Sequence, residues 1–403
     1  MVFENESLAL TDQQCQLAML GEFLSQNYEF RRNILSDTYE IREINNSGSE
    51  SAFRPLTKEA RNSILRRIKM AGIEVDSLSQ NLDEFIYSEE TKQFNPVGEY
   101  LGNLPKWDGR NHIGMLFGRI PGMTTEQHGF AATWLRSGVA HWLGIDTVHG
   151  NECVITLIGP QGCGKSTFCH FLLPPHLRVY YLDHLNLGNK NDKEMALTNN
   201  MLVNLDELDQ IKPGQHAELK QALSKVQVNG RPIYGRAQKC RRRFASFVST
   251  TNNLHPLTDP TGSRRYLCIR IPDGELIDND TPIDYEQLYA QVVYEVKELG
   301  MRYWFTNEET KRIEELNQDF QRVMSLESMV DACFRHPKEG ETVEPISASM
   351  ILEELANEFP SLQITESVKV RLGLLLKNEK FEKAHKEHGS FYFIVPRHLN
   401  REK

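Results

Sequence analysis

The spacing of hydrophobic positions changes several times along the chain, and the changes predict where elements begin and end. Among the first 94 residues, apolar residues three and four apart indicate helices, whereas a partly alternating stretch broken by Ser36-Asp37 is typical of a β-hairpin. The helical segments are 11–26, 57–71 and 78–88, and the hairpin is 28–44. We therefore predict a small helix-rich α+β domain over 1–94, for which a winged helix is one candidate.

Short, mostly apolar runs characterise the centre of the chain. They lie at 153–158, 201–205 and 244–250, and an alternating run follows at 266–271. Runs of this length are typical of strands buried on both faces of a parallel sheet. The pattern predicts an α/β domain with a mostly parallel sheet over 151–335, including a helical extension. A linker rich in Pro and Gly and a helical lead-in precede it over 95–150, with an amphipathic helix at 124–144.

The last segment, 341–403, has the pattern of a separate domain. A helix over about 350–359, capped by Ser349, is followed by a helix over about 367–380 and by the apolar run 391–395. Helix, helix and hairpin in this order are typical of a winged helix, a relative of the helix-turn-helix.

Composition and charge narrow the class of protein. The chain has 403 residues, 39% of them hydrophobic and 25% charged, as in ordinary globular proteins. A net charge of -9 excludes a wholly basic nucleic-acid coat but not a local basic surface. Seven cysteines without a Cys-x-x-Cys pair disfavour disulfide frameworks and zinc sites, and fit a reducing cytoplasm. Because no apolar run reaches about 18 residues and the N-terminus is acidic, we expect a cytoplasmic protein without a membrane partner.

The most specific motif follows the run 153–158. Residues 159–166 read GPQGCGKS, which fits the G-x-x-x-x-G-K-[ST] pattern of a phosphate-binding loop between a strand and a helix. The glycines let backbone N–H groups face phosphates, Lys165 reaches the β- and γ-phosphates, and the Ser166 hydroxyl binds Mg²⁺. We expect ATP contacts from Gly159, Pro160, Gln161, Gly162, Cys163, Gly164, Lys165, Ser166 and Thr167. A redox role is an alternative for Cys163.

An acidic pair ends the next apolar run. Residues 201–207 read MLVNLDE, so Asp206 and Glu207 follow a predicted buried strand, at the edge where α/β sheets bind ligands. Successive side chains of a strand point in opposite directions, which allows the two acids different roles. We expect Asp206 to hold Mg²⁺ and Glu207 to act as general base on the attacking water. An acidic surface turn is the alternative.

Polar residues also flank the later strands. A strand over 244–250 beside that of Asp206 would bring Asn252 to the γ-phosphate, with Asn253 as the fallback. Twelve residues further on, either Arg264 or Arg265 would stabilise charge on the transferred phosphoryl group as an arginine finger, often supplied by a neighbouring subunit. The alternatives are a strand-end cap for Asn252 and a solvated charge pair for the arginines.

A basic stretch stands out in this acidic chain. Residues 231–244 read RPIYGRAQKCRRRF and contain no acid. Cations at this density attract nucleic-acid phosphates, and a tyrosine can stack on bases. We expect DNA contacts from Arg231, Tyr234, Arg236, Lys239, Arg241, Arg242 and Arg243. A solvated charge run, or arginines serving a neighbour's ATP site, are the alternatives. A weaker basic set near the C-terminus, which fits DNA or protein contacts, comprises Lys369, Arg371, Lys377, Lys380, Lys383, His385, Lys386 and His388.

Five phrases occur in a specific order: NPVGEYLGNLPKWDGR, LIGPQGCGKSTF, LVNLDELD, FVSTTN and DPTGSRRY. Over about 95–272 the chain resembles the virulence-associated protein E family of phage and mobile-element ATPases, whose core is similar to superfamily-three helicases of the AAA+ class. The resemblance implies a P-loop NTPase core, a ring that is usually hexameric, nucleotide at subunit interfaces, and a hairpin over 230–243 facing DNA. It also implies a primase, which would be a separate chain.

Two functions stay open from the sequence. The first is an ATP-hydrolysing DNA helicase, translocase or replication-initiation ATPase of a phage or mobile element, acting on single-stranded or forked DNA. The second is a nucleotide-switched regulatory module, for defence or initiation, that binds DNA or protein without unwinding. A small-molecule kinase would leave Asn252 and the arginine pair unexplained.

Overall fold

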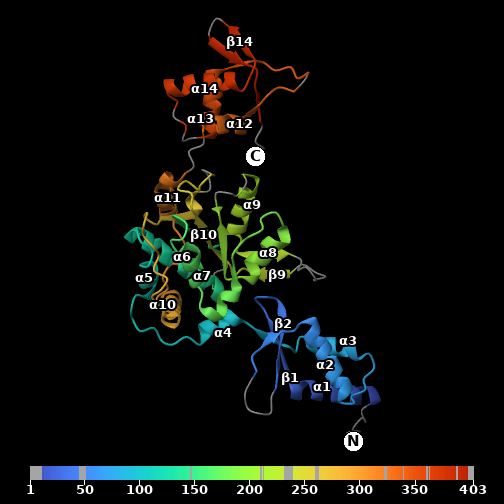
Figure 1. Cartoon of the computed structure of the whole chain (residues 1–403). Coiled ribbons are helices and arrows are strands. Elements are labelled where there is room, and N and C mark those ends of the chain that lie inside the picture. Colours follow the sequence, from blue (N-terminus) through green and yellow to red (C-terminus); the bar gives the residue numbers. More distant parts are fainter. Residues whose placement is uncertain are drawn as a thin grey trace, which may run out of the picture. The chain divides into compact units, whose positions relative to one another are not determined.

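The computed structural model describes residues 11–44, 51–145, 148–208, 211, 213–230, 239–258, 263–321, 325–338, 340–359, 362, 364–386 and 389–397. The chain divides into two compact units, one made of Met1–Leu254 with Arg264–Glu315 and the other of His255–Ser263 with Leu316–Lys403 (Figure 1). In the described part of the chain, none of the helices combines the length and apolar character needed to cross a bilayer.

The N-terminal part of the first unit is an α+β lobe. Its elements are α1 (Asp12–Asn27), β1 (Tyr28–Asn33), β2 (Thr38–Glu43), β3 (Arg54–Pro55), α2 (Lys58–Met70), α3 (Leu78–Ile86) and β4 (Lys92–Phe94). The predicted helices and hairpin are confirmed, and Thr11 begins α1 with a capping box to Gln14. The strands form a sheet in the order β3-β2-β1-β4. The lobe therefore has more β-structure than the helix-rich prediction, because β3 and β4 are too short to show a period.

A five-stranded parallel sheet forms the centre of the first unit. Its strands are β5 (Val154–Ile158), β6 (Tyr181–Leu182), β7 (Leu202–Asp206), β10 (Ser246–Thr251) and β11 (Tyr266–Arg270), in the order β11-β5-β10-β7-β6. All neighbouring strands run parallel. The prediction of a parallel α/β sheet is confirmed. The runs are mostly apolar because both faces of the sheet are buried, with every residue of β5 and β10 in the core.

Helices surround this sheet, and two of them differ from the sequence predictions of a linker and of an amphipathic helix. They are α4 (Pro96–Gly102), α5 (His112–Phe117), α6 (Thr125–Leu143), α7 (Lys165–Phe171), η1 (Pro175–Tyr180), α8 (Lys190–Asn199), α9 (Pro213–Ser224), η3 (Ser263–Arg265), α10 (Tyr285–Lys297) and α11 (Asn307–Leu316). The expected linker contains α4, which Asn95 caps and which buries Val97 and Leu101. Helix α6 is not amphipathic, because even Arg136 and His141 on it are buried.

A two-stranded hairpin leaves the sheet before β10. Strand β8 (Gln227–Gly230) pairs antiparallel with β9 (Lys239–Arg242), and Arg243 follows directly. Figure 1 shows β9 beside α8, which agrees with the hydrogen bond between Arg241 and Thr198.

The second unit has a single core of its own. Its elements are η4 (Gln318–Phe320), α12 (Leu326–Cys333), β12 (Phe334–Arg335), β13 (Ile346–Ser347), α13 (Ala348–Glu358), α14 (Glu366–Asn378), β14 (Lys383–Lys386), β15 (Gly389–Tyr392) and β16 (Val395–Pro396). The two predicted helices and the hairpin are present. However, α12 also packs into this core, whereas the predicted domain boundary places α12 in the preceding domain, 151–335. Ser347, not Ser349, caps α13 by accepting a hydrogen bond from the Met350 N–H.

Candidate functional site

The loop after β5 is built on glycines with left-handed backbones. Gly162 and Gly164 have φ of 84° and 91°, a conformation that other residues adopt with strain. At Gly164 a Cβ would lie 2.5 Å from the Asn279 amide nitrogen, which donates to the Gly164 carbonyl at 3.0 Å. The Ile277 N–H also donates to the Cys163 carbonyl. The segment 277–279 therefore braces the loop, a role that no sequence motif indicated.

Lys165 connects this loop to Asn252, which directly follows β10 and lies 87 residues further along the chain. Its side chain is 7% exposed, and its ammonium donates to the carbonyls of Gly159 and Pro160 at 2.7 and 2.8 Å. It also donates to the Asn252 side-chain oxygen at 2.9 Å. The structure thus brings together two residues that the sequence singled out separately.

The acidic pair lies on the neighbouring strand at the same edge of the sheet. Asp206 is opposite Thr250 in the register of β7 and β10, and the Thr250 hydroxyl donates to the Asp206 carboxylate at 2.6 Å. Glu207 has a φ of 52°, and its N–H donates to the Thr250 carbonyl. The left-handed turn ends the strand at Asp206, so the two exposed carboxylates do not follow strand alternation, contrary to the sequence argument. Thr250 is a further polar residue that the sequence analysis did not single out.

Three strand ends therefore place a cation, two carboxylates and an amide at one edge of the sheet. Ser166, Asp206, Glu207 and Asn252 are all exposed there. Hydroxyl and carboxylate oxygens are the ligands that Mg²⁺ prefers, so Ser166 and Asp206 fit such an ion chemically. Within the described ranges, no group of three His, Cys, Asp or Glu side chains forms a metal site by itself.

The arginine pair lies at the opposite edge of the sheet. Arg264 and Arg265 belong to η3, immediately before β11, and the first residue of β11 pairs with Val154 at the start of β5. The glycine loop follows the other end of β5, about 15 Å away at 3.3 Å per residue. Arg264 is exposed, whereas Arg265 is 13% exposed and lies 3.6 Å from the Glu152 carboxylate. Both arginines line a cavity of about 310 Å³ together with His149, Trp304 and Phe305.

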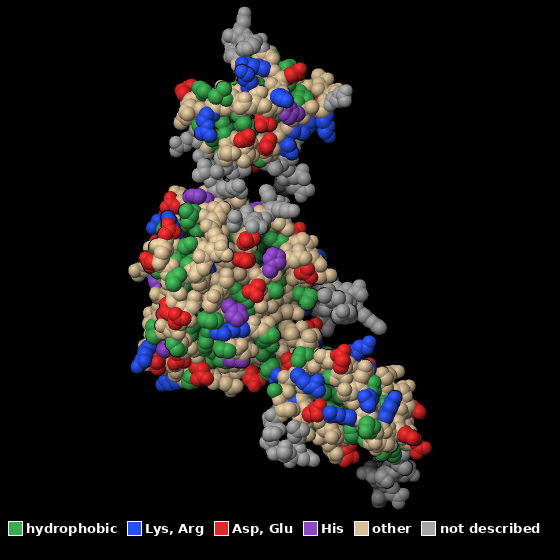
Figure 2. All heavy atoms as spheres, in the orientation of Figure 1, with side chains coloured by type: hydrophobic (Ala, Val, Ile, Leu, Met, Phe, Trp, Pro, Cys, Tyr) green, Lys and Arg blue, Asp and Glu red, His purple; other side chains and the backbone are tan. Residues whose placement is uncertain are grey.

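The described part of the basic stretch faces inward. Arg241 is 17% exposed and donates to the Thr198 hydroxyl, and Arg242 donates to the His141 carbonyl. Arg243 is fully buried among backbone carbonyls, so the expectation that it contacts DNA is wrong. Arg231, Tyr234, Arg236 and the side chain of Lys239 lie outside the described residues. On the face shown in Figure 2, the described Lys and Arg side chains are scattered and form no continuous stripe.

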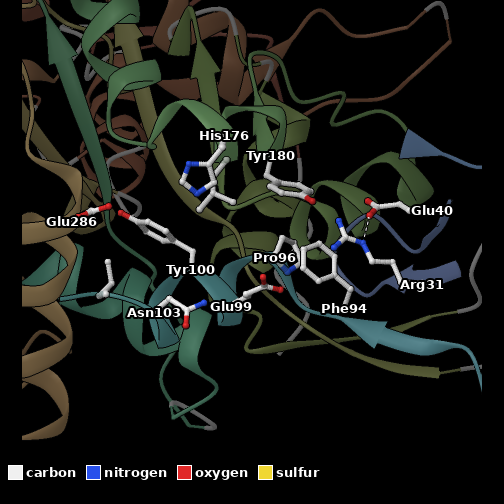
Figure 3. Close-up of a pocket in the computed structure, with 12 residues that line it drawn as sticks. Arg31, Glu40, Phe94, Pro96, Glu99, Tyr100, Asn103, His176, Tyr180 and Glu286 are labelled. Carbon is white, nitrogen blue, oxygen red and sulfur yellow. Dashed lines mark hydrogen bonds and ion pairs between the residues drawn. The ribbon is translucent and has the colours of Figure 1, made fainter. Parts of the chain in front are cut away.

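A second cavity, of about 410 Å³, lies between the N-terminal sheet and the helices α4 and η1 (Figure 3). Arg31 forms an ion pair with Glu40 at 2.6 Å, and its guanidinium lies 3.3 Å from the centre of the Phe94 ring. Tyr100 and His176 face each other edge to face across the same cavity. The phrase NPVGEYLGNLPKWDGR contributes five lining residues, but none of the candidate site residues lines the cavity, so it is separate from the glycine-loop site.

Thiol reactivity tests the buried packing around the glycine loop. Cys15 and Cys240 are exposed, and the other five cysteines, Cys163 included, are buried. Burial raises the pKa of the Cys153 and Cys169 thiols to about 12. We expect two fast equivalents with Ellman's reagent at pH 8 in the native chain and seven after denaturation, because the thiolate is the reactive form. A fast thiol left in the double variant Cys15→Ser, Cys240→Ser would contradict this packing.

Comparison with known proteins places the chain in a family. The family model of the virulence-associated protein E-like domain matches residues 101–322, whereas no curated protein matches the sequence. The apo structure of the NrS-1 C-terminal region is 12% identical with a TM-score of 0.45, over 96% of this chain and 100% of that one. The A form of the same region is 12% identical with a TM-score of 0.44, over 94% of this chain and 98% of that one. Likeness at this level does not assign a function. The family match, which extends over more than half of the residues, shows that this chain belongs to the virulence-associated protein E-like domain family.

Proposed function

We propose that this chain is an ATP hydrolase with a P-loop NTPase core. The observation that carries the proposal is the contact between Lys165 and Asn252, at the edge where Thr250 also donates to Asp206. Phosphoryl transfer needs a lysine in a glycine loop, a carboxylate at the end of a strand and an amide near both. Lys165, Asp206 and Asn252 supply these groups.

Each group has a specific part in this proposal. When ATP binds, the Lys165 ammonium exchanges the neutral carbonyls of Gly159 and Pro160 for phosphate oxygens. The exchange is favourable because the phosphate oxygens carry negative charge. Ser166 and Asp206 hold Mg²⁺, which would withdraw charge from the phosphates when bound. Glu207 accepts the proton of the attacking water, and the Asn252 amide orients that water. The loop residues Gly159 to Thr167 supply hydroxyls and, except at Pro160, backbone N–H groups around the phosphates.

The position of the arginine pair supports an oligomer. Arg264 is exposed at the edge of the sheet opposite its own glycine loop, so it serves the nucleotide of a neighbouring subunit. Arg265 is held by Glu152 inside its own chain, which makes Arg264 the better candidate for the arginine finger. We propose a ring, hexameric as the family resemblance implies, with ATP at each interface.

We further propose that hydrolysis is coupled to DNA, as in a helicase, translocase or initiation ATPase of a phage or mobile element. Membership of the family supports this proposal. The cations that would meet single-stranded or forked DNA are now Arg231, Arg236 and Lys239, with Tyr234 available for stacking. The C-terminal unit, which contains α12, α13, α14 and the β14–β15 hairpin, is proposed as a winged helix for DNA or protein contacts, and a primase as a separate partner. The second candidate is a nucleotide-switched regulatory module without unwinding.

The test is the ATPase rate with and without single-stranded DNA, at low and moderate salt. Lys165→Ala is the control, because loss of the ammonium should remove nucleotide binding. Stimulation by DNA that fades with salt supports the DNA-coupled enzyme, since the cations then compete with salt for phosphates. Turnover that DNA does not change favours the regulatory module. Equal turnover in Lys165→Ala and wild type would overturn the assignment of the site.

A further inference from the structure

Three consecutive arginines each bind near the C-terminal end of a different helix. Arg241 donates to Thr198 in α8 at 3.0 Å, Arg242 to the His141 carbonyl in α6 at 2.9 Å, and Arg243 to the Leu223 carbonyl in α9 at 2.5 Å. The last carbonyls of a helix carry the negative end of its dipole, which attracts the Arg242 and Arg243 cations, whereas Arg241 binds a hydroxyl and lies 3.6 Å from the Glu194 carboxylate. The run Arg241–Arg243, here called the arginine clamp, therefore fixes the base of the β8–β9 hairpin to three helices.

Arg243 is the centre of this clamp. It is 0% exposed, and its guanidinium also donates to the carbonyls of Lys225, Ala245 and Asn151 at 2.7, 2.7 and 3.0 Å. Burial lowers the pKa of Arg243 to about 10, which still leaves the group charged near neutral pH. A buried cation is costly unless it is fully hydrogen-bonded, and a hydrophobic side chain would fill the same space at a lower cost. The charge therefore serves to hold several segments in fixed positions.

Two of these segments lead to the glycine-loop site. Asn151 precedes β5, which ends at the glycine loop, and α9 follows the acidic pair and ends where Arg243 binds. The twelve residues of α9 span about 18 Å at 1.5 Å per residue, comparable to the width of the sheet along its strands. Gly150 permits the two segments to meet, because a Cβ there would lie 3.2 Å from the Ser224 carbonyl oxygen.

The hairpin is joined to the same point. Strand β8 begins at Gln227, two residues after Lys225, and β9 runs directly into Arg243. A single guanidinium thus ties both strands of the hairpin to the ends of β5 and α9 that lie away from the site. This guanidinium is therefore a physical connection through which a displacement of either element at the nucleotide edge can reach the hairpin.

We infer that Arg243 is a positioning residue that makes the β8–β9 hairpin respond to nucleotide bound at residues 159–166. The inference rests on the proposed function, because it takes nucleotide as the input. A purely structural Arg243 would affect stability alone, whereas a coupling residue also determines whether the hairpin responds.

Hydrogen exchange of the full-length chain measures this response, because it reports local opening segment by segment. On addition of Mg²⁺ with a non-hydrolysable ATP analogue, exchange in the wild type should slow at 159–166 and change at 227–230 and 239–245. In Arg243→Gln the change at 159–166 should persist and the change at the hairpin should be lost. Arg243→Lys keeps the charge and should lose most of the hairpin response, because one ammonium cannot reach all four carbonyls.

Arg136→Lys is the matched control. Arg136 is also a buried arginine, but it binds the Glu295 carboxylate and the Arg302 carbonyl, neither of which belongs to the hairpin. It should lower the unfolding temperature and keep the hairpin response. A full hairpin response in Arg243→Lys or Arg243→Gln overturns the inference, as does a wild-type hairpin that ignores nucleotide while 159–166 responds. No response at 159–166 in the wild type overturns the proposed function and the inference with it. If Arg243→Gln does not fold, Arg243→Lys decides.

Discussion

Replacing Arg264 by alanine is expected to lower ATP turnover by about 10³-fold or more, with ATP binding close to that of the wild type. Arg264 is exposed at the amino end of β11, and its own glycine loop lies beyond the far end of β5. In the proposed ring it stabilises charge on a phosphoryl group held by a neighbouring subunit. ATP binding persists because Lys165 and the glycine loop of each chain are unchanged.

Mixing variants separates this role from a local one. Arg264→Ala keeps its glycine loop, and Lys165→Ala keeps its arginine, so a mixed interface contains one intact site. Turnover should reappear when the two inactive variants are combined under conditions in which subunits exchange. Arg312→Ala, an exposed arginine paired with Glu126, is the control and should stay active alone. If the mixture stays as inactive as its components, Arg264 does not act on a neighbour.

Glu207→Gln is expected to bind ATP and to hydrolyse it roughly 10²-fold more slowly, because an amide cannot accept the proton of the attacking water. The substitution keeps the size of the side chain and leaves the N–H bond to the Thr250 carbonyl in place. Equilibrium binding of a fluorescent ATP analogue and single-turnover hydrolysis measure the two properties separately. Equal hydrolysis rates in the variant and the wild type would assign the base to another group.

The central sheet could be predicted from the sequence because its strands are buried on both faces, which makes the runs predominantly apolar. Composition and periodicity were less reliable where packing against the rest of the protein determines whether a segment is helical or buried. The segment around Pro96 has the composition of a linker, yet Asn95 and Pro96 begin a helix whose Val97 is buried. Helix α6 has polar positions that a surface helix would expose, but Arg136 finds Glu295 inside the protein.

The candidate site was predictable where a motif and a strand coincide, as for Lys165 and Asn252, which the structure brings to 2.9 Å. Thr250 and Asn279 were missed because their partners, Asp206 and Gly164, are distant in sequence. The basic stretch shows a different limit. A sequence gives the density of charge but not the direction of the side chains. Nothing in the sequence indicates that helix-end carbonyls, rather than phosphates, bind Arg242 and Arg243.

The separation of Arg264 from the glycine loop has a consequence for symmetry. An interface related by a two-fold axis uses the same patch on both subunits, so it would need both edges of one sheet within a single patch. Here the loop follows the carboxyl end of β5, and the arginine precedes the strand that pairs with the amino end of β5. Contacts that join the arginine edge of one subunit to the glycine-loop edge of the next are head-to-tail. An open row of such subunits leaves an unused arginine edge at one end and an unused glycine-loop edge at the other. Such an assembly completes every site only when it closes into a ring, and an open pair of subunits completes one site at most.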